Sequence, residues 1–382
     1  MVPEGWEVKP LSEIAKEKIS YGIVQAGPHV PDGVPYIKSS DVRGIIEPDD
    51  LQRTSTEIHY KYRRSAVHPG DIVFSLRGNI GESAIVPPEL PEANLTQGTA
   101  RISVSERHSN RFHFYQLASA PLLNRVNALS KGSTFKEISL EELRKVRVLC
   151  PPLPEQKKIA QILSTWDQAI SATERLLENS QQRKKGLMQQ LLTGKKRLPG
   201  FEGEWRFISF TDGFSVVNQK SSQVKSSEYQ LSGSIPIIDQ GQNEIAGYCE
   251  HDSPYTDLPV VIFGDHTRAL KWVDFPFCPG ADGTQVLKAK PILNEKFAYF
   301  VLSHVELPNL GYSRHMRELK QREFKVPVEI EEQRQIAITL TTADSEIRAL
   351  SHRLHFLKQE KKALMQQLLT GKCRVRVDTE AA

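Results

Sequence analysis

The amino-acid sequence predicts an α+β fold in which two mixed α/β globular domains alternate with two long helices. One observation is an internal repeat: residues 155–195 align without a gap with residues 332–372, with 22 identities in 41 positions and a shared ending, LMQQLLTGK. The other is that the remaining segments are short β-branched runs separated by Gly, Pro, Asn and Asp, which is typical of mixed sheet. Because a repeat constrains architecture more firmly than local propensity does, we expect an internal pseudo-two-fold arrangement.

Both copies of the repeat have the apolar spacing of a long helix. Leucine and isoleucine recur every three or four residues, and the first copy has polar interruptions at Thr173, Ser180 and Lys184. Each copy opens after a proline and closes at a Thr-Gly pair, as expected for helix ends. A helix of 39 residues spans about 58 Å, and its single apolar stripe needs a partner along its length. The other copy is the obvious partner, in an antiparallel coiled coil. Periodicity alone leaves open whether the pair is only a hairpin or oligomerisation arm, or a spacer of defined length.

The two globular segments share a common order of motifs. A Trp entry recurs at Trp6 and Trp205, and a short apolar strand with proline follows in each half, VPYI and IPII. The runs GDIVFSLRGN and LPVVIFGDHTR come next, and NLTQGTARISV later resembles GADGTQVLKAK. We therefore expect a first globular domain at residues 1–150, a central long helix at 151–197, a second globular domain at 198–326, a C-terminal long helix at 327–376 and a tail at 377–382.

Composition narrows the class of protein. With 382 residues, 39% apolar and 25% charged, the chain is neither disordered nor a membrane protein, and no signal-peptide pattern is found, so we expect a cytoplasmic protein. The four cysteines are widely spaced, which predicts reduced thiols, most of them buried. The net charge is only +4, and the positive excess lies in residues 155–197, with nine basic and four acidic side chains.

Motifs of catalysis are missing from the sequence. It contains no GxxxxGK[ST], HExxH or GxSxG pattern, and no Asn/Asp-Pro-Pro-aromatic tetrad of the amino-methyltransferases. Asp71 and Asp265 sit at strand edges, where the usual role of a carboxylate is to cap backbone amides. We therefore predict no catalytic residue, no cofactor and no metal site. The chain is expected to be a binding protein that supports chemistry carried out by others.

The chain resembles the specificity subunits of type I restriction-modification enzymes. The resemblance rests on PLPEQKKIAQIL with its long helix, on the closing LMQQLLTGKKRLPGF, on the repeat of both near the C-terminus, and on two variable globular halves with GW-type openings. It extends over essentially the whole chain. The second copy departs from the pattern at its start, PVEIEEQ, which lacks the double proline of PPLPEQ.

The resemblance implies a function and a set of partners. Each globular half would be a target-recognition domain that reads one half-site of a split, asymmetric sequence in double-stranded DNA, and the helices would fix the distance between the half-sites. The helices would also recruit two copies of the modification methyltransferase subunit and, through them, the restriction and translocase subunit. This chain would be non-catalytic, because adenine methylation and ATP-dependent cleavage would belong to those partners. Basic side chains of the helix, from Arg183 to Arg197, would suit docking or phosphate contact.

Base-reading residues are expected among polar side chains in loops that follow strands. In the first globular domain we predict DNA contacts by Lys38, Ser39, Ser40, Arg43, Arg77, Asn79, Lys131, Ser133, Thr134 and Lys136. In the second we predict DNA contacts by Gln240, Gln242, Asn243, His266, Arg268, Tyr312, Arg314, His315 and Arg317.

Two other functions remain open at this point. The first is a recognition chain of a related restriction system that cuts beside its site. Nothing in this sequence distinguishes such a chain from a type I specificity subunit. The second is a coiled-coil scaffold that binds only proteins. A scaffold would show no salt-dependent affinity for duplex DNA, whereas proteins that contact phosphates lose affinity steeply as salt rises.

Overall fold

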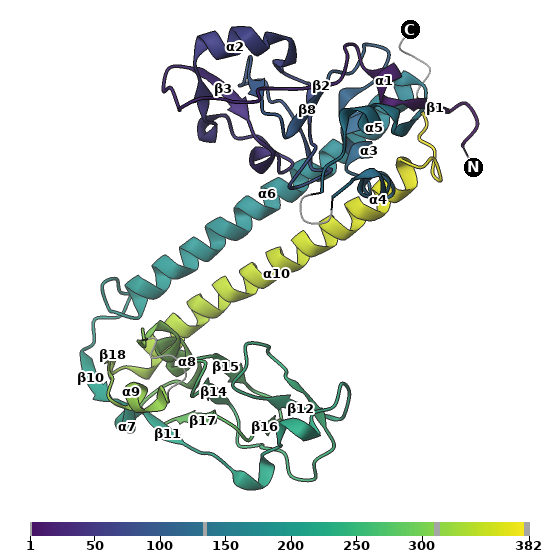
Figure 1. The fold of residues 1–382 in the computed structure, drawn as a ribbon. Coiled ribbons are helices and arrows are strands. Elements are labelled where there is room, and N and C mark those ends of the chain that lie inside the picture. Colours follow the sequence, from purple (N-terminus) through teal and green to yellow (C-terminus); the bar gives the residue numbers. More distant parts are fainter. Residues whose placement is uncertain (1, 133–135, 309–313, 378–382) are drawn as a thin grey trace. The chain divides into compact units, whose positions relative to one another are not determined.

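The computed structural model describes residues 2–132, 136–308 and 314–377 and divides the chain into two compact units. The first unit comprises residues 1–173 and 353–382, and the second comprises residues 174–352. Each unit therefore holds one globular body with parts of both long helices (Figure 1). Both bodies mix helices and strands, which confirms the α+β class.

The elements of the first body and the helix that follows it are β1 (Glu7–Pro10), α1 (Leu11–Ile14), β2 (Ser20–Tyr21), β3 (Val34–Ile37), β4 (Arg53–Thr54), α2 (Thr56–Tyr62), β5 (Ile72–Ser75), β6 (Ser83–Ile85), β7 (Asn94–Leu95), β8 (Thr99–Ile102), α3 (Asn110–Leu117), α4 (Ala120–Leu129), α5 (Leu140–Lys145), β9 (Arg147–Cys150) and α6 (Leu153–Leu191). Those of the second body and its helix are β10 (Trp205–Ser209), α7 (Phe210–Gly213), β11 (Phe214–Val216), β12 (Ile235–Ile238), β13 (Gly247–Cys249), β14 (Val260–Gly264), β15 (Leu270–Val273), β16 (Cys278–Pro279), β17 (Thr284–Ala289), α8 (Glu295–His304), α9 (Met316–Lys320), β18 (Glu323–Pro327) and α10 (Ile330–Leu368).

Both bodies have the same sheet topology. The four-stranded sheet has the order β2-β8-β5-β6 in the first and β11-β17-β14-β15 in the second. The three-stranded sheet has the order β4-β3-β7 in the first and β13-β12-β16 in the second, and in both the pair β3–β7 or β12–β16 is parallel. The antiparallel pairs β1–β9 and β10–β18 join the start of each body to the strand before its long helix. The motifs VPYI and IPII thus form equivalent strands.

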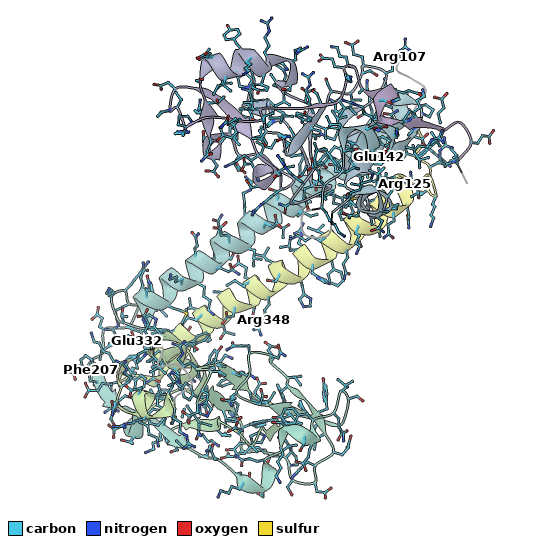
Figure 2. The ribbon with its side chains drawn as sticks, in the orientation of Figure 1. Arg107, Arg125, Glu142, Phe207, Glu332 and Arg348 are labelled. Atoms are coloured by element: carbon cyan, nitrogen blue, oxygen red, sulfur yellow. The ribbon has the colours of Figure 1, made fainter. Side chains whose placement is uncertain are left out.

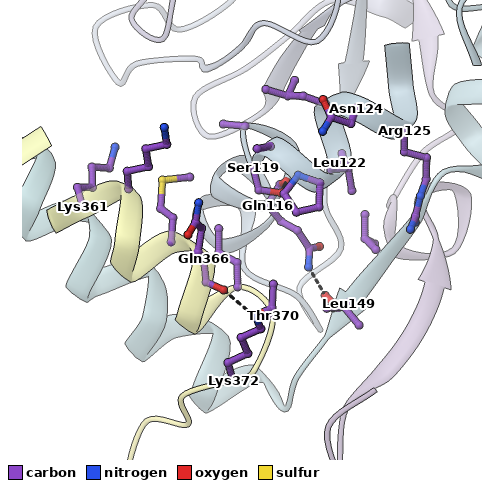
Figure 3. Close-up of a pocket in the computed structure, with 18 of the residues that line it drawn as sticks. Gln116, Ser119, Leu122, Asn124, Arg125, Leu149, Lys361, Gln366, Thr370 and Lys372 are labelled. Carbon is purple, nitrogen blue, oxygen red and sulfur yellow. Dashed lines mark hydrogen bonds between the residues drawn. The ribbon is translucent and has the colours of Figure 1, made fainter. Parts of the chain in front are cut away.

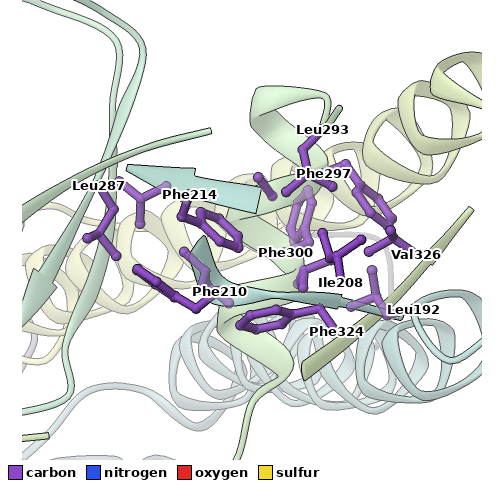
Figure 4. Close-up of a cluster of buried hydrophobic side chains, with 14 of the residues drawn as sticks. Leu192, Ile208, Phe210, Phe214, Leu287, Leu293, Phe297, Phe300, Phe324 and Val326 are labelled. Carbon is purple, nitrogen blue, oxygen red and sulfur yellow. The ribbon is translucent and has the colours of Figure 1, made fainter. Parts of the chain in front are cut away.

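The core of the second body is rich in phenylalanine (Figure 4). Phe210 stacks on Phe214 with ring centroids 5.3 Å apart, and Phe324 meets Phe214 edge-on at 5.4 Å. Apolar side chains from the C-terminal end of α6 and the N-terminal part of α10 join this core, among them Leu192 just after α6 and Ile336 in α10. Each buried aromatic ring removes a large apolar area from water, so the globular body and the two helix segments stabilise one another.

The long helices pair their polar interruptions within each unit. α6 and α10 each contain 39 residues, and α6 begins one residue before Pro154, so that this proline lies in the first turn of the helix. In the second unit the Lys184 ammonium pairs with Asp344 at 2.5 Å, and the Ser180 hydroxyl donates to Glu346 at 2.9 Å. In the first unit Lys361 pairs with Asp167 at 2.5 Å. Ser180 and Lys184 of the α6 stripe are therefore met by polar groups of α10, whereas the Thr173 hydroxyl donates to the Ala169 carbonyl of its own helix.

A buried carboxylate closes the helix junction of each unit. In the second unit Glu332, fully buried in the first turn of α10, accepts two hydrogen bonds from the Arg197 guanidinium, at 2.5 and 2.7 Å. The same guanidinium lies over the Trp205 ring. In the first unit Glu155 of α6 accepts two hydrogen bonds from Arg374, at 2.7 and 2.9 Å.

Trp6 completes the junction of the first unit. Arg374 lies over its ring, and its indole N–H donates to Glu155 at 3.1 Å. Glu332 follows Glu155 by 177 residues, and Arg374 follows Arg197 by the same number, which is the offset of the sequence repeat. We refer to these two groups, Glu155–Arg374–Trp6 and Glu332–Arg197–Trp205, as the junction clamps.

The glycine of the repeated Thr-Gly pair belongs to the same clamps. Gly194 and Gly371 both have a φ of +70°, the left-handed conformation that ends many helices. A Cβ at Gly194 would lie 3.3 Å from the Trp205 ring, and one at Gly371 would overlap Pro3 and lie 3.4 Å from Trp6. In both copies of the repeat, the glycine of the shared ending therefore forms a tight turn that packs against a tryptophan ring.

The four cysteines are unpaired, as predicted from their spacing. Cys150, Cys249 and Cys278 are buried, and Cys373 is exposed. In the part of the chain that the structure describes, no helix combines the length and the apolar character that crossing a bilayer requires.

Removing the cation of the second clamp should destabilise the protein. In Arg197→Ala the buried Glu332 carboxylate loses its partner, and breaking a buried ion pair in this way costs about 3 kcal/mol. We expect a correspondingly lower denaturant midpoint in urea unfolding followed by tryptophan fluorescence. Lys196→Ala, which removes an exposed neighbouring cation, is the control and should leave the midpoint unchanged. Equal midpoints for the two variants would contradict the assignment of the clamp.

Candidate nucleic-acid interface

Three loops of the first body meet at one end of its sheets. They follow β3 (Lys38–Ser40), follow β5 (Arg77–Asn79) and precede β8 (Gln97–Gly98). Arg77 Nη2 lies 3.4 Å from Gln97 Oε1. A Cβ on Gly98 would lie 3.1 Å from Arg77 Nε and 3.3 Å from Ser39 Oγ, so the three loops are in close contact. We call Ser39, Arg77, Gln97 and Gly98 the first loop cluster.

Backbone contacts position this cluster. Thr99, at the start of β8, donates through its hydroxyl to the carbonyl of Ile37, the last residue of β3, at 3.3 Å. Ser75 donates to the Arg77 carbonyl at 3.0 Å. Asp41 accepts from the Lys38 backbone N–H at 2.9 Å and fixes the turn after β3. The polar side chains therefore project from loops that the sheets hold in place.

A fourth segment of the first body adjoins the cluster. Glu137 forms backbone bridges with both Arg77 and Lys131, so Lys131 and Glu137 lie beside the loop after β5. Lys131 and Lys136 are exposed, and so are Ser40 and Asn79, whereas Lys38 is half-buried. The predicted contacts Ser133 and Thr134 lie outside the described residues. Arg43 is exposed on a different turn, whose Gly44 pairs with Ala84 of β6.

The second body brings equivalent loops together. Gln240, after β12, accepts at Oε1 from the His266 backbone N–H at 3.2 Å, and its carbonyl accepts from the Thr267 hydroxyl after β14. Gly283, before β17, lies so close that a Cβ there would overlap the Gln240 side chain. Gln240, His266, Thr267 and Gly283 form the second loop cluster. Gln242 and Asn243 are exposed in the loop that continues from it.

The last predicted group of the second body divides into exposed and buried residues. Arg314 and Arg317 are exposed. Arg268 is half-buried in a left-handed conformation, with a φ of 61°, and donates to the Leu307 carbonyl at 3.0 Å. Tyr312 lies outside the described residues.

His315 does not fit its predicted role. Its side chain is fully buried, and its Nδ1 lies 2.9 Å from the Asp265 carbonyl. The prediction of a DNA contact here is corrected, because a ring without exposed surface stabilises the loop and does not reach a ligand.

The two strand-edge aspartates have the capping role expected of them. Asp71 accepts from the His68 backbone N–H at 3.0 Å, and Asp265 accepts from the Met316 backbone N–H at 2.7 Å. Asp265 thereby fixes the start of α9, next to the buried His315.

Sequence reasoning missed several members of the clusters. Gln97 could have been found by aligning TQGT with ADGT, since both precede equivalent strands. Lys271 lies inside β15 and donates to the Asp239 carbonyl at 2.8 Å, and burial lowers the pKa of this ammonium while Asp239 raises it. The sequence around Lys271 gives no sign that its side chain lies next to the loop after β12.

A groove of about 740 Å³ lies elsewhere in the first unit, between α4, β9 and the C-terminal end of α10 (Figure 3). Its floor is apolar, with Leu122, Leu149 and Leu369, and Gln116 donates to the Leu149 carbonyl at 3.1 Å. Its lining also includes cationic side chains from α10 and the body, namely Lys358, Lys361, Lys362, Lys372, Arg125 and Arg147.

Three basic residues of the α6 segment form ion pairs within the second unit. Arg183 pairs with Glu346, Lys184 with Asp344, and Arg197 with Glu332. Lys195 and Lys196 are exposed. The cations expected to serve docking or phosphate contact thus include three that hold α10 segments in place.

Comparisons with known proteins agree with this architecture. Residues 3–179 match the family model described as type I restriction modification DNA specificity domain. A type I restriction enzyme specificity subunit of Methanocaldococcus jannaschii, MjaX, is 25% identical over 98% of this chain and 95% of its own length. The EcoBI specificity subunit of Escherichia coli is 27% identical over 54% of this chain and 44% of its own length.

A solved structure shares the fold. The type I restriction-modification S subunit from M. genitalium matches with a TM-score of 0.68 at 16% identity, over 97% of this chain and 99% of that one. The fold is thus that of a type I S subunit, and the family model that matches residues 3–179 describes a DNA specificity domain. Over nearly its whole length the chain is similar to a specificity subunit of a type I restriction enzyme.

An alanine at Gly283 should disturb the second loop cluster. Its φ of +61° costs an L residue about 1 kcal/mol, and the new Cβ would displace the Gln240 side chain. We expect Gly283→Ala to lower the thermal midpoint slightly and to weaken specific DNA binding about tenfold, the loss of one paired base contact. Gly186→Ala is the control, since nothing lies within 4 Å of a Cβ there and the second helix has Ala363 at that position. Unchanged DNA affinity in Gly283→Ala would exclude Gln240 as a reader.

Proposed function

We propose that each loop cluster reads one half-site of a bipartite, asymmetric target in double-stranded DNA. The observation that carries the proposal is that the same three strand ends present different side chains in the two bodies. Ser39, Arg77 and Gln97 occupy these ends in the first, and Gln240 and His266 in the second. Since base edges are distinguished by their pattern of donors and acceptors, different side chains imply different half-sites.

The chemistry of the clusters suits base recognition. An arginine such as Arg77 can donate two hydrogen bonds to the O6 and N7 atoms of guanine, and a glutamine such as Gln240 can pair with adenine at N6 and N7. Exposed cations around them, including Lys131, Lys136, Arg314 and Arg317, are suited to phosphates, which position a protein without reading sequence. Ser40, Arg43, Asn79, Gln242 and Asn243 remain proposed contacts on the same argument.

The helices are proposed to set the distance between half-sites. α6 and α10 run through 39 residues each, and a straight helix of that length spans about 58 Å. The polar pairs Lys184–Asp344 and Lys361–Asp167 support their association as an antiparallel coiled coil. The length compares with about 34 Å for one turn of duplex DNA, so the two heads would meet major grooves one to two turns apart.

The repeated helices are also proposed to recruit the enzymes of the complex. Exposed apolar side chains lie on both, including Leu176 on α6 and Ile338 and Phe356 on α10. Because a repeated sequence offers equivalent docking surfaces, two copies of the methyltransferase subunit would bind, and the restriction and translocase subunit would join through them. Adenine methylation and ATP-dependent cleavage would be their activities. The groove beside α4 is an apolar surface in the first unit suited to such docking.

Methylation mapping tests the proposal. DNA from cells that express this chain with its methyltransferase should carry methylated adenines in a split motif that is absent with the methyltransferase alone. In Arg77→Ala we expect methylation of that motif to fall about tenfold or more, since a paired base contact contributes about 1–3 kcal/mol. The part of the motif read by the second body should stay the same.

The control for this experiment is Arg107→Ala, an exposed arginine of the first body on the loop before α3 (Figure 2). It should leave the motif and its methylation level unchanged. If an active methyltransferase yields no motif that depends on this chain, the chain is a protein scaffold and the proposal fails.

Lengthening the spacer should move the half-sites apart without changing them. Duplicating residues 191–194 adds four residues to the end of α6, which at 1.5 Å per residue is about 6 Å, or close to two base pairs. Methylation mapping should show the same half-site sequences with a wider gap. A four-residue insertion after Ser232, in an exposed loop of the second body, is the control and should leave the gap unchanged. Altered half-sites after the α6 insertion would contradict the spacer role.

A further inference from the structure

Two histidines and a cysteine meet inside the first unit, away from the loop clusters. His108 lies on the loop before α3, His113 lies on α3, and Cys150 ends β9. One ligand atom of each lies within 4.8 Å of the others. His113 and Cys150 are buried, and His108 is half-buried.

The fold does not require these residue types. The N-cap residues Ser109 and Asn294 begin the equivalent helices α3 and α8, and the repeat offset relates Cys150 to Pro327. Counting from the caps, His108 and His113 correspond to Leu293 and Ala298 of the second body, which are both buried. The second body thus builds the same junction with apolar side chains, so the polar cluster of the first needs another explanation.

The hydrogen-bond network assigns a lone pair to His108. Gln156 of α6 accepts from the Ser109 backbone N–H at Oε1, 2.9 Å, and donates from Nε2 to the Pro151 carbonyl, 2.8 Å. These two bonds fix the orientation of its amide. Gln156 Nε2 also lies 3.3 Å from His108 Nδ1, and an amide NH₂ can only donate, so His108 Nδ1 accepts and carries a lone pair.

Neither neutral tautomer of His113 satisfies its surroundings. Its Nε2 lies 3.4 Å from His108 Nδ1, and its buried Nδ1 forms no hydrogen bond of good geometry among the described residues, although the Gln116 side chain interacts with the ring. With the proton on Nε2, the orphaned Nδ1 lone pair stays buried. With the proton on Nδ1, two lone pairs face each other beside the Cys150 sulfur. A buried polar group left in this state is costly unless something else satisfies it.

We propose that His108 Nδ1, His113 Nε2 and Cys150 Sγ bind a zinc ion. In a tetrahedral site with Zn–N bonds of about 2.05 Å the two nitrogens would be about 3.3 Å apart, close to the 3.4 Å between these atoms. Two imidazoles and a thiolate are ligands suited to zinc and not to magnesium or calcium. Water would supply the fourth ligand, because Glu7, opposite Cys150 in the β1–β9 pair, is exposed and pairs with Lys9 at 2.5 Å.

Zinc binding would require neutral imidazoles and a thiolate at Cys150. The Cys150 thiol would release its proton to solvent as the Zn–S bond forms, so one proton leaves for each ion bound.

The ion would tie α3 to the junction of β9 and α6. Cys150 is followed by two prolines and then by the first turn of α6, where Gln156 accepts from the Ser109 backbone N–H next to His108. Zinc would take the His108 Nδ1 lone pair from Gln156, which keeps its bond to the Pro151 carbonyl. A zinc ion would therefore fix the angle at which α6 leaves the first body. This inference does not depend on the proposed half-sites, because it concerns metal binding and folding stability alone.

The test uses the full chain, purified from zinc-supplemented cells without a histidine tag. Elemental analysis should find one equivalent of zinc per chain, and removal of the metal by a chelator should lower the thermal midpoint reversibly. Substituting Co²⁺ for zinc should produce a sulfur-to-cobalt charge-transfer band. The double variant His108→Leu/His113→Ala, which imports the residues of the second body, should fold, as judged by circular dichroism, and lose the bound zinc.

Two further variants complete the test. Cys150→Ser should lose the charge-transfer band, and Cys373→Ser, which removes an exposed cysteine, should retain both the band and the full equivalent of metal. Folded wild-type protein that takes up no zinc, or a folded double variant that binds zinc as tightly as wild type, would overturn the assignment.

Discussion

The burial of Glu155 and Glu332 is the constraint on which the rest of the structure depends. A carboxylate withdrawn from solvent must be paired, because an uncompensated buried charge is strongly destabilising. Each finds its partner, Arg374 or Arg197, at the far end of the other long helix, and a tryptophan at the start of a globular body covers the pair. Neither unit is complete until the beginning of one helix, the end of the other and the first strand of the body have met. This requirement explains why the repeat is strongest at EQ and at LLTGK.

The clamps belong to the part of the chain that maintains the fold. The loop clusters, which are proposed to recognise DNA, are a separate part. Sheet order, parallel strand pairs and helix junctions are the same in both bodies, whereas the loop clusters share position but not chemistry. Arg77 and Gln240 follow strands whose own side chains are buried, so a change of loop residue alters the surface offered to a ligand at little cost to the core. If the loop clusters read the proposed half-sites, a protein built in this way could acquire a new pair of them by altering loops without changing its helices.

The sequence predicted what depends on periodicity and repetition, and failed where distant residues meet. The two helices, the paired halves and the capping roles of Asp71 and Asp265 follow from local pattern. Arg197 looked like a free cation because its partner Glu332 is 135 residues away. His315 looked like a loop residue, but the fold inserts its ring beside Asp265. Gln97 and Arg77 are 20 residues apart, and only the return of β8 beside β5 makes them neighbours.

Differences between the copies are as informative as their likeness. Where both bodies need the same contact, they keep the same residue, as with Gln156 and Gln333, which accept from the helix caps Ser109 and Asn294. Where the first body has His108, His113 and Cys150, the second has the apolar residues Leu293, Ala298 and Pro327 in the same places. Equivalent positions of the two bodies can therefore be compared directly. Where one body has a polar residue and the other an apolar one, the fold that they share does not require the polar residue. The α3 junction, where His108, His113 and Cys150 face apolar counterparts, is the place where this reasoning supports the proposed metal. In the loops both copies are polar, as with Arg77 and His266, so there it is the change of side chain that supports the proposed half-sites.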